Sequence, residues 1–69
     1  MKITLNSKEE FLDTPKIALT INEVRALKKY SFRNLIIRIN GQLVKRENFD
    51  SAEVREGDNV EIIHLIAGG

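Results

Sequence analysis

The residues of this chain that could enter a reaction are the last three, Ala67-Gly68-Gly69. Glycine loses the most backbone entropy on ordering and packs nothing, so two final glycines add little to a fold. Three extended residues reach about 10 Å, enough to carry an α-carboxylate into another protein's active site. We therefore expect Gly69 to be the reactive residue, on a slim lead formed by Ala67 and Gly68. The alternative is a frayed terminus, or a chain cut at a glycine.

The composition argues against an independent enzyme. The 69 residues contain no cysteine and one histidine, His64. There is therefore no disulfide, no thiolate nucleophile and no zinc site of the usual imidazole or thiolate ligands. The sequence shows no nucleophile–base pair and no phosphate loop, so we expect no cofactor and read His64 as a structural or interface residue.

Charge and hydropathy narrow the class of partner. The net charge is +1, and the basic pairs Lys28-Lys29 and Lys45-Arg46 do not form a continuous stripe. We therefore expect no nucleic-acid binding. The first residues lack the apolar stretch of a signal peptide, and no apolar run approaches the length of a membrane span. We expect a cytoplasmic protein, monomeric when alone, with no membrane partner.

The first half of the chain predicts a hairpin and a helix. Polar and apolar residues alternate over residues 2–6, as in a half-buried strand, and residues 9–12 are expected to return as a short second strand. Thr14-Pro15 ends regular structure there. Thr20 and Glu23 form a capping box for a helix near Ile21 to Lys29. On that helix we expect an apolar stripe toward the core, formed by Ile21, Val24 and Leu27. The basic residues should point mostly outward: Arg25, Lys28 and Lys29.

The second half predicts another hairpin and a closing strand. Asn40-Gly41 separates strands at residues 35–39 and 42–45, and this dipeptide is the strongest short hairpin signal. Residues 46–50 read as a turn or 3₁₀ segment that inserts Phe49 into the core. After a turn at residues 56–58, the last strand runs from 59 to 66.

The resulting order, ββαβββ, is that of an α+β β-grasp, the ubiquitin-like arrangement, with a mixed sheet of four or five strands and one main helix across it. We expect the folded domain to span residues 1–66 and the flexible tail residues 67–69. The expected core is Ile3, Leu5, Val24, Leu27, Ile37, Ile39, Phe49, Val60 and Ile62.

Side-chain alternation predicts an interface beside the tail. If Glu61 points outward, then Val60 and Ile62 face the core, and His64 is considered for the same side. By the same alternation Ile36, Ile63 and Leu65 form an exposed apolar patch, with Arg38 at its edge. Such a patch on a small domain is typical of a partner site. The alternative is that these strands are covered on both faces.

With this order and tail, the chain resembles the ThiS family of sulfur carriers of thiamin biosynthesis, and the related small subunit of molybdopterin synthase. The resemblance spans nearly the whole chain. It rests on the segments Thr20-Ile21, Asn40-Gly41, Arg46, Phe49, Glu56-Gly57-Asp58-Asn59-Val60-Glu61 and Ile66-Ala67-Gly68-Gly69.

The resemblance implies that an ATP-dependent, ThiF-like enzyme adenylates the Gly69 carboxylate. A sulfur donor then replaces the AMP, and a ThiG-like thiazole synthase consumes the thiocarboxylate. The chemistry is sound, because a carboxylate with a pKa of about 3.5 is a poor electrophile until it carries a leaving group. Without cysteine, only the carboxyl terminus could carry transferable sulfur. Two alternatives stay open: a carrier for molybdopterin synthesis, tRNA thiolation, amino-acid sulfur delivery or protein conjugation, and a ubiquitin-like binding module with an inert tail.

Overall fold

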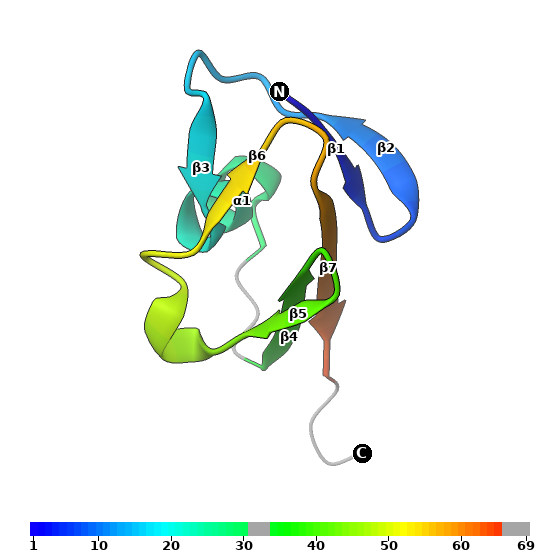
Figure 1. The fold of residues 1–69 in the computed structure, drawn as a ribbon. Helices are drawn as coiled ribbons and strands as arrows, with labels where there is room; N and C mark the ends of the chain where they lie inside the picture. The colour runs from blue at the N-terminus through cyan, green and yellow to red at the C-terminus, as the bar shows by residue number, and fades with distance from the viewer. Residues whose placement is uncertain (31–33, 66–69) are drawn as a thin grey trace.

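The structure is a computed structural model that describes residues 1–30 and 34–65 (Figure 1). It confirms the α+β class, with one α-helix and a mixed sheet in the described part of the chain. In chain order the elements are β1 (Lys2–Leu5), β2 (Lys8–Phe11), β3 (Ala18–Thr20), α1 (Ile21–Lys28), β4 (Leu35–Ile39), β5 (Gln42–Val44), the 3₁₀ helix η1 (Arg46–Asn48), β6 (Glu53–Arg55) and β7 (Asn59–His64).

The main sheet has five strands in the order β2-β1-β7-β4-β5. Its centre is β7, which runs parallel to β1 and antiparallel to β4 (Figure 1). The two hairpins, β1–β2 and β4–β5, flank this central strand. The last element of the described chain is thus held from both sides.

Two short strands were not expected from the sequence. β3 and β6 pair antiparallel as a separate two-stranded sheet, with Leu19 opposite Val54. Each strand has three residues, which is too short to show a period-2 pattern. Leu19 and Val54 are nevertheless buried and belong to the core.

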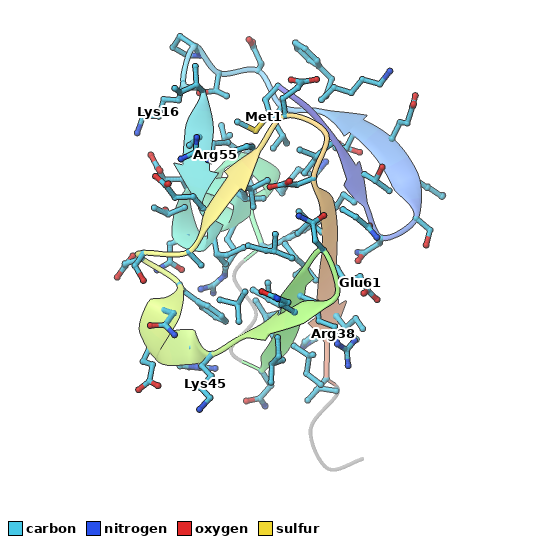
Figure 2. All side chains as sticks on the ribbon, in the orientation of Figure 1. Met1, Lys16, Arg38, Lys45, Arg55 and Glu61 are labelled. Atoms are coloured by element: carbon cyan, nitrogen blue, oxygen red, sulfur yellow. The ribbon has the colours of Figure 1, made fainter. Side chains whose placement is uncertain are left out.

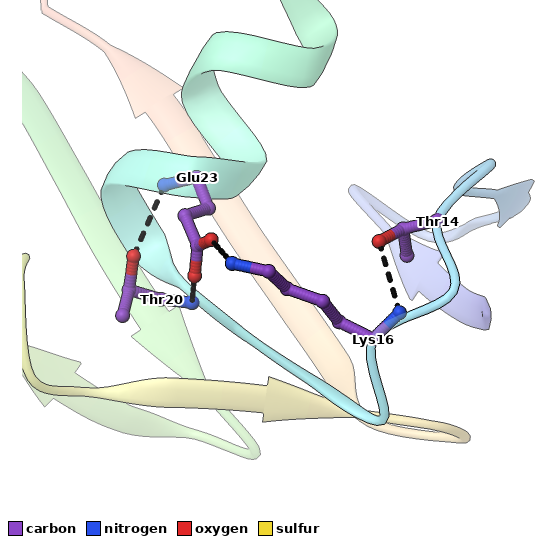
Figure 3. A network of polar contacts seen from close by, with 4 residues as sticks. All are labelled: Thr14, Lys16, Thr20 and Glu23. Carbon is purple, nitrogen blue, oxygen red and sulfur yellow. Dashed lines mark hydrogen bonds and ion pairs between the residues drawn. The ribbon is translucent and has the colours of Figure 1, made fainter.

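The helix begins as predicted. The Thr20 hydroxyl accepts a hydrogen bond from the Glu23 amide at 3.1 Å, and the Glu23 carboxylate accepts one from the Thr20 amide at 2.9 Å. Figure 3 shows that Lys16 reaches the same carboxylate from the preceding loop. The Lys16 ammonium, and then the Thr20 amide, lower the pKa of Glu23 below its usual range. The capping box is therefore tied to the loop that precedes β3.

The end of the helix corrects the predicted faces. Leu27, expected in the core, is 45% exposed. Three residues advance by about 300° around a helix, which is about 60° short of a full turn. Leu27, six residues after Ile21, therefore lies about 120° away from it and off the buried face. Lys28, expected outward, is half-buried and forms an ion pair with Glu10 of β2, which raises the pKa of Lys28. The buried helical stripe is therefore short, and an ion pair continues it.

One apolar core joins α1 to both sheets. Phe49 is buried directly after η1, as predicted, while Ile39 is half-buried at the edge of the core. The core consists of Ile3, Leu5, Leu12, Leu19, Ile21, Val24, Ile37, Phe49, Val54, Val60 and Ile62. In the described ranges no helix is long and apolar enough to cross a membrane.

Both hairpin turns use asparagine in the left-handed region. Asn6 and Ser7 join β1 to β2 with φ of 51° and 71°, and Asn40 and Gly41 join β4 to β5 with φ of 50° and 84°. Asparagine and glycine tolerate this region better than other residues. The Asn40-Gly41 hairpin was predicted. The strand β2 of the first hairpin begins and ends one residue before its predicted range of 9–12.

Candidate functional site

The central strand β7 separates the core from an outer face. Val60 and Ile62 are buried, whereas Glu61 and Ile63 point to the opposite side of the sheet. This is the alternation that the sequence predicted. β7 is also the last strand of the described chain (Figure 1), and it is followed by Leu65 on the way to the carboxyl terminus.

Apolar side chains from two neighbouring strands meet on this outer face. Ile36 of β4 lies directly opposite Ile63 of β7. Ile63 is 40% exposed, Leu65 is 46% exposed, and Ile36 is half-buried. The amide of Leu65 donates to the carbonyl of Asn34 at 2.9 Å, so the chain stays beside β4 past the end of β7. We call Ile36, Ile63 and Leu65 the outer patch.

A fourth apolar residue extends this face beyond what the sequence predicted. Leu43 of β5 lies opposite Arg38 of β4 and is 62% exposed. Because opposed residues in an antiparallel pair point to the same face, Leu43 lies on the outer face with Arg38. The hairpin register set by Asn40-Gly41 was the signal that could have placed Leu43 there.

An ion pair borders the outer patch. Arg38 lies opposite Glu61, and a guanidinium nitrogen is 3.9 Å from a carboxylate oxygen. Both side chains are partly exposed (Figure 2), so the pair contributes about 0–1 kcal/mol to folding. Either charge could therefore be redirected to a docked partner at small cost to the fold.

The sequence profile of the ThiS family matches residues 3–69. The chain belongs to the ThiS family. Members of this family are sulfur carriers, not enzymes. The resemblance of the sequence to this family is thereby confirmed.

Two solved structures resemble this ThiS-family chain. The crystal structure of a thiamine biosynthesis protein (ThiS) from Geobacter metallireducens is 30% identical, with a TM-score of 0.85 and all of both chains covered. The NMR solution structure of a thiamine biosynthesis protein from Geobacter metallireducens is 33% identical, with a TM-score of 0.77, all of this chain covered and 88% of that one. No curated protein matched the chain. These matches confirm the ThiS-like β-grasp.

The predictions for the remaining site residues differ in how the structure bears on them. Ala67, Gly68 and Gly69 lie outside the described residues, so their role stays a prediction. His64, considered for the core side, is exposed because it lies at the end of β7, past the last buried residue, Ile62. Across residues 1–30 and 34–65, no three histidine, cysteine or acidic residues gather as they would around a metal ion.

Proposed function

We propose that this chain carries sulfur for thiazole formation in thiamin biosynthesis, as a co-substrate whose reactive group is the Gly69 carboxylate. That carboxylate attacks the α-phosphorus of ATP in a ThiF-like adenylating enzyme, and pyrophosphate leaves. A sulfur nucleophile then attacks the acyl carbon and displaces AMP. The resulting thiocarboxylate passes its sulfur to a ThiG-like thiazole synthase.

The observation that carries this proposal is the family match, which runs through the final diglycine. It is supported by the name of the Geobacter protein, a thiamine biosynthesis protein solved both in a crystal and in solution, which favours the thiamin pathway. The thiocarboxylate would also replace the thiolate that this cysteine-free chain lacks.

The docking surface in this proposal is the outer patch, with Arg38 at its edge. The patch exposes apolar side chains that a partner can cover, and its residues come from β4, β7 and the residue after β7. Binding there would hold the body of the carrier while the tail enters the nucleotide site. A partner carboxylate could take the place of Glu61 beside Arg38, which would favour one orientation of the complex.

The experiment is a reconstitution with purified partners. The chain, ATP, sulfide and the adenylating enzyme of the same organism are incubated with its thiazole synthase and the remaining thiazole precursors. We expect thiazole to form in proportion to the amount of carrier. A parallel reaction with molybdopterin synthase that lacks its own small subunit should give no sulfur transfer. Transfer to molybdopterin synthase but not to thiazole would assign the carrier to the other pathway.

A further inference from the structure

β7 extends further toward the tail than its neighbour β1. In the described part of the chain, β1 pairs with β7 through Thr4–Asn59 and Leu5–Val60. The Asn6 amide adds one more hydrogen bond, to the Val60 carbonyl at 2.9 Å. The chain then turns away into β2, whereas β7 continues to His64. Ile62 therefore lies past the end of β1.

The side chain of Asn6 takes the place of the missing strand residue. Its Oδ1 accepts a hydrogen bond from the Ile62 amide at 2.9 Å, and its Nδ2 donates to the Ile62 carbonyl at 3.1 Å. A carboxamide offers one acceptor and two donors, so it can pair with both backbone groups of one residue. Asn6 thus continues the β1 side of the sheet by one position toward the tail.

The segment that follows Ile62 is the stem, which we define as residues 63–65. β4 holds the stem on one side: Ile63 lies opposite Ile36, and the Leu65 amide donates to Asn34 at 2.9 Å. Asn6 acts on the other side, at the residue directly before the stem. Hydrogen bonds on both sides of β7 therefore restrict the direction in which the backbone leaves the sheet.

We propose that Asn6 is a positioning residue for the acyl-activation step. Its carboxamide fixes β7 at Ile62, so that the Gly69 carboxylate reaches the nucleotide in a narrow range of orientations. This inference rests on the proposed function for its kinetic consequence. A reaction is faster when the reacting groups are held close to the productive geometry. If β7 is held less firmly, the carboxylate spends less time in that geometry, and kcat falls even when docking is unchanged.

The side-chain chemistry distinguishes this role from a turn preference alone. At φ of 51°, glycine serves the Asn6 turn as well as asparagine does, but it makes neither bond to Ile62. Aspartate keeps the shape of the side chain but loses the donor, and its charge would face the Ile62 carbonyl. Asn6→Gly therefore removes both bonds to Ile62, whereas Asn6→Asp removes the bond to the Ile62 carbonyl and keeps an acceptor for the Ile62 amide.

Asn40 provides a matched control at the opposite end of β7. Its φ is 50°, its Oδ1 accepts from the Asn59 amide at 2.9 Å, and its Nδ2 donates to Asp58 at 3.1 Å. Asn40→Gly therefore removes an asparagine of the same conformation and a bond to the same strand. The difference is that Asn59 begins β7, whereas Ile62 precedes the stem.

The structural arm of the test is amide hydrogen exchange by NMR. In Asn6→Gly the Ile62 amide loses its acceptor, and we expect it to exchange at least about tenfold faster than in the parent chain. Asn40→Gly should accelerate Asn59 and leave Ile62 unchanged. Equal Ile62 protection in the parent and Asn6→Gly would overturn the assignment, whether or not the chain is a sulfur carrier.

The kinetic arm is ATP–pyrophosphate exchange with the cognate adenylating enzyme and the full chain. We expect Asn6→Gly and Asn6→Asp to lower kcat about 3- to 10-fold with KM within twofold. Asn40→Gly should stay within twofold in both constants. Equal losses in the Asn6 and Asn40 variants, or an unchanged kcat in Asn6→Gly, would contradict the positioning role. If the parent chain supports no exchange, the proposed function fails, while hydrogen exchange still decides whether Asn6 holds β7.

Discussion

Replacing Leu65 by aspartate should weaken docking on the adenylating enzyme without unfolding the carrier. Leu65 is 46% exposed, so about half of its surface remains for a partner to cover. Full burial of a leucine side chain is worth about 1.5–3 kcal/mol, which leaves about 1 kcal/mol for docking. An unpaired charge in the same interface adds about 1–2 kcal/mol. The sum of about 2–3 kcal/mol should raise Kd about 30- to 150-fold.

The matched control is Phe11→Asp. Phe11 is 72% exposed, more than Leu65, but it lies in β2, at the sheet edge opposite β5. Binding is measured by isothermal titration calorimetry and stability by urea unfolding. Phe11→Asp should unfold within about 0.5 kcal/mol of the parent, because exposed substitutions change stability little. Leu65→Asp should lose about 1–1.5 kcal/mol and stay folded, because about half of the leucine surface is covered within the carrier itself. Parent-like binding by Leu65→Asp, or an equal loss in Phe11→Asp, would refute docking through the outer patch.

Three further outcomes are expected. Phe49→Ala should lower the free energy of unfolding by about 3–5 kcal/mol in urea titrations, because Phe49 is buried; a loss below 1 kcal/mol would contradict its anchoring role. Gly68→Val, or one residue added after Gly69, should abolish ATP–pyrophosphate exchange while leaving the thermal unfolding midpoint unchanged; normal exchange would contradict a narrow channel. The pKa of Glu23 is lowered in the fold, chiefly by Lys16, so ionised Glu23 stabilises the fold above its unfolded pKa, and this stabilisation is lost as the pH falls through the folded pKa. The parent should therefore lose more stability than Lys16→Met between about pH 7 and pH 3. Parallel profiles of unfolding free energy against pH would contradict this.

Local rules predicted the elements that position the site. The capping box of Thr20 and Glu23 marks the helix start because it depends on residues three apart. Side-chain alternation placed Glu61 outward and Ile62 inward because a strand has a period of two. Both rules use only neighbours in the sequence, and for that reason the outer face could be predicted before the fold was known.

Features set by distant contacts could not be predicted in this way. Asn6 bonds to Ile62 from 56 positions away, and no local pattern marks that pair. Lys28 is half-buried because Glu10 of β2 pairs with it across the fold. In each case the pairing of strands or the packing of the helix decided the environment.

The central claim is that the Gly69 carboxylate becomes a thiocarboxylate, and intact-mass spectrometry tests it most directly. The full chain is incubated with ATP, sulfide and the cognate adenylating enzyme, with an ATP-free reaction as the control. Exchange of one oxygen for sulfur raises the mass by about 16 Da, and fragmentation should place the change on Gly69. An unchanged mass alongside an enzyme shown to be active, or a mass gain located away from Gly69, would contradict the account.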